Sequence, residues 1–156
     1  NIEASQIKGD NNWALLLGTD GFITEGTGDN FFIIKDGVVI TPEGRDVLRG
    51  ISREYVMNEL CTELNIPVIE KNIEPYDVYN ADEAFMTGTP FCMLPVTSLN
   101  NLKIGDGKVG NIFTQLIRKW SKNTKVNIIE QIKQWDKSKK PNKDSSAPTP
   151  YQFKAK

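Results

Sequence analysis

The sequence predicts one α/β domain with a mixed sheet and outer helices. Short apolar runs alternate with stretches of helical spacing, a pattern typical of α/β proteins. Tight turns also join some of these runs into hairpins, so the strands cannot all be parallel. With 156 residues, of which 38% are hydrophobic and 25% charged, the chain is long enough to bury a single core.

The expected strands are short and are separated by turn residues. Asp20-Gly21 and Asp36-Gly37 are the clearest turn signals, and the second predicts a hairpin between residues 31–34 and 38–41. In chain order the expected strands are residues 13–17, 22–24, 31–34, 38–41, 68–69, 84–86 and 93–96.

Four stretches carry helical spacing. The expected helices are residues 51–64, 76–81, 112–120 and 126–135. Asn65 is a plausible end for the first of them, because asparagine tolerates the left-handed conformation that often closes a helix.

The composition excludes several chemistries. The chain has no histidine, so Ser-His-Asp and Cys-His catalysis and His-containing metal sites are ruled out. Two separated cysteines, Cys61 and Cys92, cannot form a Cys-rich metal site or a disulfide framework, and we expect reduced thiols in a cytoplasmic protein. No phosphate-binding P-loop or dinucleotide-binding glycine pattern is present, and we expect no metal site.

Net charge and hydropathy limit which partners we expect, and the composition near the C-terminus sets the expected end of the domain. The net charge of −1 gives no electrostatic case for nucleic acid, and no apolar run approaches 18 residues, so we expect no membrane helix. Residues 137–156 hold six lysines and one aspartate and are rich in serine and proline, which predicts a solvated basic tail. The expected domain therefore covers residues 1–136.

Three motifs suggest a ligand site. Glu25 lies in a Gly-rich bend between two apolar runs, Gly50-Ile51-Ser52 opens the first long helix, and Gly88-Thr89-Pro90 follows a strand. A helix start presents unpaired backbone N–H groups that bind phosphate. One carboxylate and two such turns suit a flat cationic heterocycle that carries a phosphate.

These motifs, in their order and spacing, resemble the larger, C-terminal domain of the fold type IV pyridoxal-phosphate enzymes. That family includes branched-chain aminotransferases, D-amino-acid aminotransferases and aminodeoxychorismate lyase. The resemblance runs from Glu3 to about Trp120. It implies a curved or barrel-like sheet, pyridoxal 5'-phosphate as cofactor, an amino acid and a 2-oxo acid as substrates, and a homodimer for the full-length protein.

The resemblance also implies roles for individual residues. Glu25 would keep the pyridine nitrogen protonated, so that the ring acts as an electron sink. The remaining cofactor-binding residues are expected to be Leu48, on one ring face, and Ile51, Ser52, Gly88 and Thr89, around the phosphate.

Each role has a structural alternative. Glu25 could be a solvated turn residue, Leu48 an ordinary core residue and Ser52 a simple helix cap. Pro90 departs from the family pattern because it has no N–H, which removes a substrate-carboxylate contact made in some relatives. We expect Asp29 and Arg53 to be structural, Arg53 through an ion pair.

No catalytic residue is expected in this chain. In the family a lysine that forms the Schiff base lies upstream of the Glu3-Ala4 match, which places it before Asn1, and none of Lys8, Lys35, Lys103 and Lys108 replaces it. The favoured function is a branched-chain aminotransferase, because residues 78–83 resemble that branch. This chain alone would be an inactive fragment. The alternatives are an aminodeoxychorismate lyase-like enzyme and a non-catalytic binding or assembly module.

Overall fold

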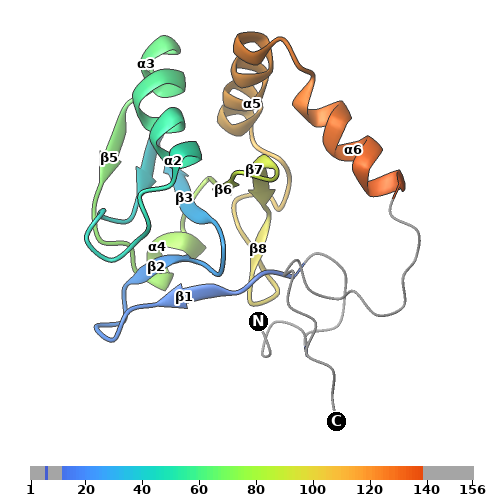
Figure 1. The fold of residues 1–156 in the computed structure, drawn as a ribbon. Helices are drawn as coiled ribbons and strands as arrows, with labels where there is room; N and C mark the ends of the chain where they lie inside the picture. Colours follow the sequence, from blue (N-terminus) through green and yellow to red (C-terminus); the bar gives the residue numbers. More distant parts are fainter. Residues whose placement is uncertain (1–5, 7–11, 139–156) are drawn as a thin grey trace.

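The computed structural model describes Gln6 and residues 12–138. Its centre is a five-stranded sheet in the order β5-β4-β3-β6-β7 (Figure 1). The strands of this sheet are β3 (Asn30–Lys35), β4 (Val38–Thr41), β5 (Val68–Glu70), β6 (Glu83–Gly88) and β7 (Cys92–Val96). Only β4 and β5 pair in parallel, so the predicted mixed sheet is confirmed.

Two smaller antiparallel pairs complete the described strands. They are β1 (Leu15–Leu17) with β2 (Ile23–Gly26), and β8 (Ser98–Leu99) with β9 (Leu102–Lys103). The second pair was missed, because its two-residue strands carry no apolar alternation. The barrel-like alternative is not formed, since the described strands make an open sheet with β5 and β7 at its edges.

The first helical segment starts where the sequence predicted. It comprises α2 (Ile51–Tyr55), the π-helical turn η1 (Val56–Leu60) and α3 (Cys61–Glu63). Asn65 has a φ of 54°, the left-handed conformation expected just beyond a helix end. The other helices are α4 (Pro75–Tyr79), α5 (Asn111–Thr124) and α6 (Ile128–Ser138).

Strand β3 separates two apolar layers. Phe32 and Ile34 face a cluster built with α2, η1 and α5, whereas Phe31 and Ile33 face a cluster that includes Ile23 of β2. Figure 1 shows the same arrangement, with α2, α3 and α5 on one side of the sheet and β1, β2 and α4 on the other. The alternation follows from the period of two along a strand that is buried on both faces.

A carboxylate positions α5 against the sheet. Both oxygens of Glu83, at the start of β6, accept hydrogen bonds of 2.9 Å, one from the Ile112 N–H and one from the Phe113 N–H. These N–H groups lie in the first turn of α5, where they have no partner within the helix. A Cβ atom on Gly110 would overlap the same carboxylate, so this helix start requires glycine.

The domain boundary stays a prediction. Helix α6 continues to Ser138, two residues past the expected limit, and the rest of the predicted basic tail lies outside the described residues.

Cys61 and Cys92 are free, and desolvation raises the pKa of the buried Cys61 thiol to about 11. Among residues 12–138, none of the helices combines the length and the apolar character that crossing a bilayer requires.

A substitution in the stacked ring pair of Phe32 and Phe85 tests this core. Both side chains are fully buried, and their ring centroids lie 4.7 Å apart at an interplanar angle of 6°. We expect Phe85→Ala to lower the free energy of unfolding by about 3–5 kcal/mol, because a large buried ring leaves a cavity. Urea unfolding measures this change. Leu102→Ala, at a site that is 59% exposed, serves as control and should cost less than ~0.5 kcal/mol. Equal losses for the two variants would contradict the core assignment.

Candidate active site

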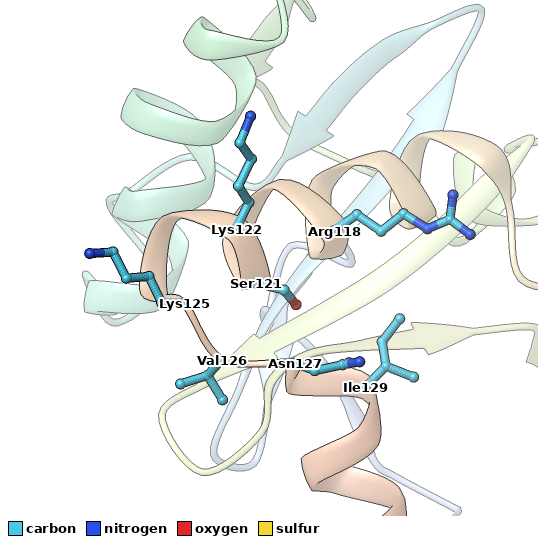
Figure 2. A pocket seen from close by; sticks show the side chains of 7 residues that line it. All are labelled: Arg118, Ser121, Lys122, Lys125, Val126, Asn127 and Ile129. Atoms are coloured by element: carbon cyan, nitrogen blue, oxygen red, sulfur yellow. The ribbon is translucent and has the colours of Figure 1, made fainter.

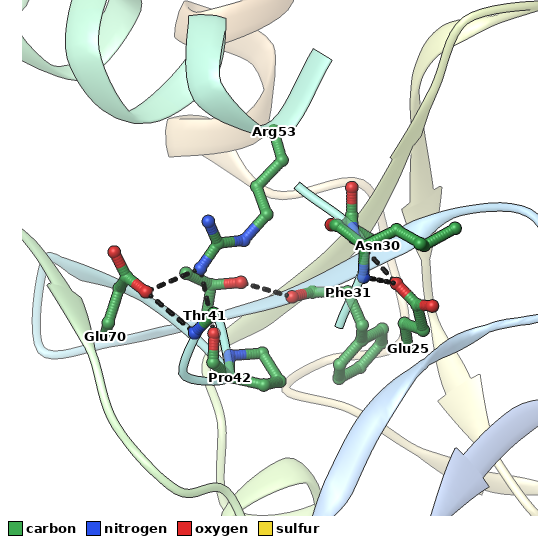
Figure 3. A network of polar contacts seen from close by, with 9 residues as sticks. Glu25, Asn30, Phe31, Thr41, Pro42, Arg53 and Glu70 are labelled. Atoms are coloured by element: carbon green, nitrogen blue, oxygen red, sulfur yellow. Dashed lines mark hydrogen bonds and ion pairs between the residues drawn. The ribbon is translucent and has the colours of Figure 1, made fainter. Parts of the chain in front are cut away.

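Glu25 is held at one end of the sheet by two hydrogen bonds to the same carboxylate oxygen. Its Oε2 atom accepts from Asn30 Nδ2 and from the Leu48 N–H, each at 2.9 Å (Figure 3). Within the described part of the chain, its other oxygen, Oε1, has no hydrogen-bond partner. The protein therefore orients this carboxylate, which argues against a freely solvated turn glutamate, and the cofactor-binding role of Glu25 stays a prediction.

The turn before α2 presents backbone donors. Gly50 is the N-cap residue of α2 and has an extended backbone conformation. No side chain makes a capping hydrogen bond at this end of the helix. The first intrahelical bond runs from the Glu54 N–H to Gly50 O at 3.0 Å, which leaves the N–H groups of Ile51, Ser52 and Arg53 without partners inside the helix. Since no side chain caps this end, the alternative of Ser52 as the N-cap is wrong.

The two apolar residues of this turn are exposed. Leu48 is 74% and Ile51 82% exposed, whereas Ser52 is only 8% exposed. The alternative of Leu48 as an ordinary core residue is therefore wrong. A large exposed apolar side chain next to an oriented carboxylate is suited to cover the face of a flat ligand.

Arg53 holds the turn before α2 on the side away from Glu25 and Asn30. Its Nη2 atom donates to Pro42 O and to Glu70 Oε2, each at 2.9 Å, and its side chain is 8% exposed (Figure 3). Glu70 Oε2 also accepts from the Gly44 N–H at 3.0 Å. The expected ion pair is confirmed, and it ties the start of α2 to the ends of β4 and β5.

The third motif lies at the end of β6. Thr87 pairs with Asn30 across the sheet, and β6 ends one residue later at Gly88. A Cβ atom on Gly88 would lie 3.4 Å from Gly28 O, so the β6–β7 turn is packed against the Glu25 bend. Thr89 and Pro90 follow, and both are exposed. The structure thus brings Glu25 and Leu48 into direct contact and places the Gly88 turn beside them.

Asn30 is the residue that sequence reasoning missed. It is 6% exposed, and its Nδ2 atom donates to Glu25 Oε2 and to Leu48 O, each at 2.9 Å. The available signal was its position as the first residue of a buried strand, five residues after Glu25. The contact with Leu48, 18 residues further on, could not be read from the sequence.

Asp29 is a second carboxylate in the bend, and burial dominates its chemistry. The residue is 8% exposed, and its Oδ2 atom is buried without a hydrogen-bond partner among the described residues. Desolvation, opposed by a backbone hydrogen bond from Gly28 and reinforced by the nearby charge of Glu25, raises the pKa of Asp29 to about 6. The two carboxyl groups therefore have distinct environments, and burial makes the charged form of Asp29 less favourable than it is in water.

Two cavities lie elsewhere. The first, about 360 Å³, lies at the α5–α6 junction, and its basic side chains, Arg118, Lys122 and Lys125, point away from one another (Figure 2). The hydroxyl in this lining is already used, since Ser121 Oγ accepts from the Ile128 N–H at 3.2 Å. The second cavity, about 240 Å³, lies on the Arg53 side of the Gly50 turn. Neither cavity is lined by Glu25 or Thr89.

In the part of the chain that the structure describes, no group of three or more Cys, Asp or Glu residues is arranged to bind a metal ion.

The buried Asp29 predicts a pH dependence of stability. Because its folded-state pKa is raised from 3.8 to about 6, the folded protein binds a proton more tightly than the unfolded chain, and the resulting stability is lost as the pH rises from about 4 to 6. We expect Asp29→Asn, which stays neutral, to match the wild type at pH 4 and to melt higher above pH 6, by about 2–4 °C for each kcal/mol gained. Melting curves across this range measure the difference. Asp106→Asn, at an exposed position, should show no such trend; an equal trend in both variants would contradict the assignment.

Comparison with known proteins gives a consistent picture. The family described as amino-transferase class IV matches residues 2–99. A probable branched-chain-amino-acid aminotransferase of Aquifex aeolicus is 41% identical over 123 residues, which cover 78% of this chain and 39% of that protein. A putative branched-chain-amino-acid aminotransferase of Methanocaldococcus jannaschii is 42% identical over 108 residues, 69% of this chain and 37% of that protein.

Solved structures agree with the sequence matches. The branched-chain amino acid aminotransferase of Escherichia coli superposes with a TM-score of 0.65 at 36% identity, over 67% of this chain and 34% of that one. The T.th. branched-chain amino acid aminotransferase with pyridoxamine 5'-phosphate superposes with a TM-score of 0.64, also at 36% identity, over 67% of this chain and 34% of that one. The chain thus spans between a third and two fifths of the length of these relatives.

Proposed function

Because this chain belongs to the class IV amino-transferase family, we propose that it forms the cofactor-binding part of a branched-chain amino acid aminotransferase. The whole protein would transfer an amino group from an amino acid to a 2-oxo acid, with pyridoxal 5'-phosphate as cofactor. The observation that carries the proposal is the oriented Glu25 carboxylate beside the uncapped start of α2. The relatives named above support an aminotransferase rather than a lyase.

The donors and acceptors of the site fit this cofactor. Glu25 Oε1 is a free acceptor among the described residues, as a protonated ring nitrogen requires. The N–H groups of Ile51 and Ser52 suit a phosphate at the positive end of a helix. Gly88 and Thr89 would complete the phosphate site, and the exposed Leu48 side chain would cover one ring face.

The residues of this chain would bind and orient the cofactor. Glu25 would keep a proton on its ring nitrogen. When bound, the cofactor supplies an electron-withdrawing ring that stabilises negative charge on the substrate Cα. Glu25 favours the protonated ring nitrogen through its negative charge, while Asn30 and Leu48 keep that carboxylate from rotating away. The N–H groups at the start of α2 would hold the phosphate, so that this chain would contact both ends of the cofactor.

The amine that binds the cofactor covalently would come from a part of the protein outside this sequence. Lys35 lies at the far end of β3 from Asn30, about 16 Å away at the usual rise of a strand, and its Nζ atom is paired with Asp82 at 3.0 Å. Lys8 lies outside the described residues. The homodimer implied by the family resemblance and the cytoplasmic location expected from the cysteines belong to the same proposal.

Glu25→Gln tests the proposal in the whole protein that contains this chain. We expect the rate of amino transfer from leucine, isoleucine or valine to 2-oxoglutarate to fall on the order of 10²–10³-fold, because a neutral side chain no longer favours the protonated ring. Glu59→Gln, at an exposed position of the π-helical turn η1, is the matched control and should retain the wild-type rate. A wild-type protein that releases pyruvate from aminodeoxychorismate and transfers no amino group would contradict the proposal and favour the lyase.

A further inference from the structure

A single amide side chain joins the two parts of the candidate site. Asn30 is buried, and both hydrogens of its Nδ2 group are used, one for Glu25 Oε2 and one for Leu48 O, each at 2.9 Å. Leu48 returns a bond from its own N–H to Glu25 Oε2, also at 2.9 Å. The three residues therefore form a closed ring of hydrogen bonds between the carboxylate and the turn.

The orientation of this amide is determined by its partners. Its nitrogen faces two acceptors, a carboxylate and a carbonyl, so a reversed amide would place Oδ1 against both of them. Oδ1 instead lies against Gly50, where a Cβ atom would overlap it. Gly50 also donates its N–H to Leu48 O at 2.8 Å, which extends the ring to the residue that caps α2.

The sheet holds Asn30 in place. It is the first residue of β3, and its backbone pairs with Thr87 of β6. A positioning group on a paired strand is more rigid than one on a loop, which is what an accurate site requires. Glu25 lies in β2, which belongs to the separate β1–β2 pair, and Leu48 lies in the connection before α2, so the Asn30 side chain links both of them to the central sheet.

We propose that Asn30 is a positioning residue that couples the Glu25 carboxylate to the phosphate-binding turn, so that a change at either one alters ligand binding at the other. This inference rests on the proposed function, because it assigns the two ends of one cofactor to these two places. It predicts that loss of the Glu25 side chain weakens phosphate binding, although Glu25 is assigned to the other end of the cofactor. Such coupling between sites is reciprocal and can be measured.

A double-mutant cycle on the whole protein tests the coupling, with inorganic phosphate as the probe and calorimetry as the measurement. In the wild-type background we expect Glu25→Ala to weaken phosphate binding about three- to tenfold, the scale of one lost hydrogen bond. In the Asn30→Ser background the same change should weaken phosphate binding by less, because the two bonds of the Asn30 amide are already lost and only the direct bond from the Leu48 N–H to Glu25 remains to be broken. A residue with only a general structural role would give additive losses.

Asn30→Asp gives a second measurement. A carboxylate there would face Glu25 Oε2 and Leu48 O, so we expect affinity for pyridoxal phosphate to fall on the order of tenfold to hundredfold. Asn101→Asp is the matched control, since it makes the same chemical change at an exposed position of the β8–β9 turn and should bind as the wild type does. Thermal melts show whether each variant folds. If Asn30→Asp fails to fold, the double-mutant cycle with Asn30→Ser tests the coupling by itself.

The outcomes separate this inference from the proposed function. A wild-type protein that binds neither pyridoxal phosphate nor inorganic phosphate would overturn the proposed function. A wild-type protein that binds both, with unchanged phosphate affinity in Glu25→Ala or additive losses in the cycle, would overturn the coupling role of Asn30 and leave the proposed function intact. Non-additive losses together with a weakened Asn30→Asp variant would support the inference.

Discussion

The structure depends on the burial of β3 on both faces. This strand pairs with β4 on one side and β6 on the other, and its side chains enter two separate apolar layers. A shift in register by one residue would move Phe32 and Ile34 into the layer that now receives Phe31 and Ile33. It would also turn Asn30 to the other face of the sheet, away from Gly50 and Leu48. The register that closes the core therefore also positions the candidate site.

The turn before α2 is held from two directions by different kinds of interaction. On one side, Glu25 and Asn30 bind the backbone of Leu48. On the other, the buried Arg53 bonds to Pro42 O and Glu70. Removing one partner from a buried charge is costly, so Arg53 strongly constrains the helix start. Two fixed sides leave the N–H groups of Ile51 and Ser52 in a defined direction, which would limit the reorganisation needed to bind the phosphate of the proposed function.

The Gly-rich bend contains two carboxylates with different environments. Glu25 is half-buried and accepts two hydrogen bonds, whereas Asp29 is buried with one oxygen that lacks a partner in the described residues. Desolvation raises the pKa of Asp29 to about 6, and the negative charge of Glu25 contributes in the same direction. A Cβ atom on Gly26 would overlap the Asp29 carboxylate, so a larger residue there would have to displace that side chain. The two carboxyl groups therefore lie close together in environments of different burial.

The sequence alone determined the local elements and the chemistry of the motifs. The Asp36-Gly37 turn predicted its hairpin because both residues adopt positive φ, and the start of α2 at Ile51 followed from the spacing of apolar residues. Glu25 could be singled out because the three motifs, in their order and spacing, resemble the fold type IV family. The tertiary structure alone decided that the sheet stays open, that Leu48 is exposed and that Asn30 joins Glu25 to Leu48. The physical reason is that local propensity acts over a few residues, whereas Leu48 lies 18 residues from Asn30 and 23 residues from Glu25 along the chain, so these contacts depend on the tertiary fold.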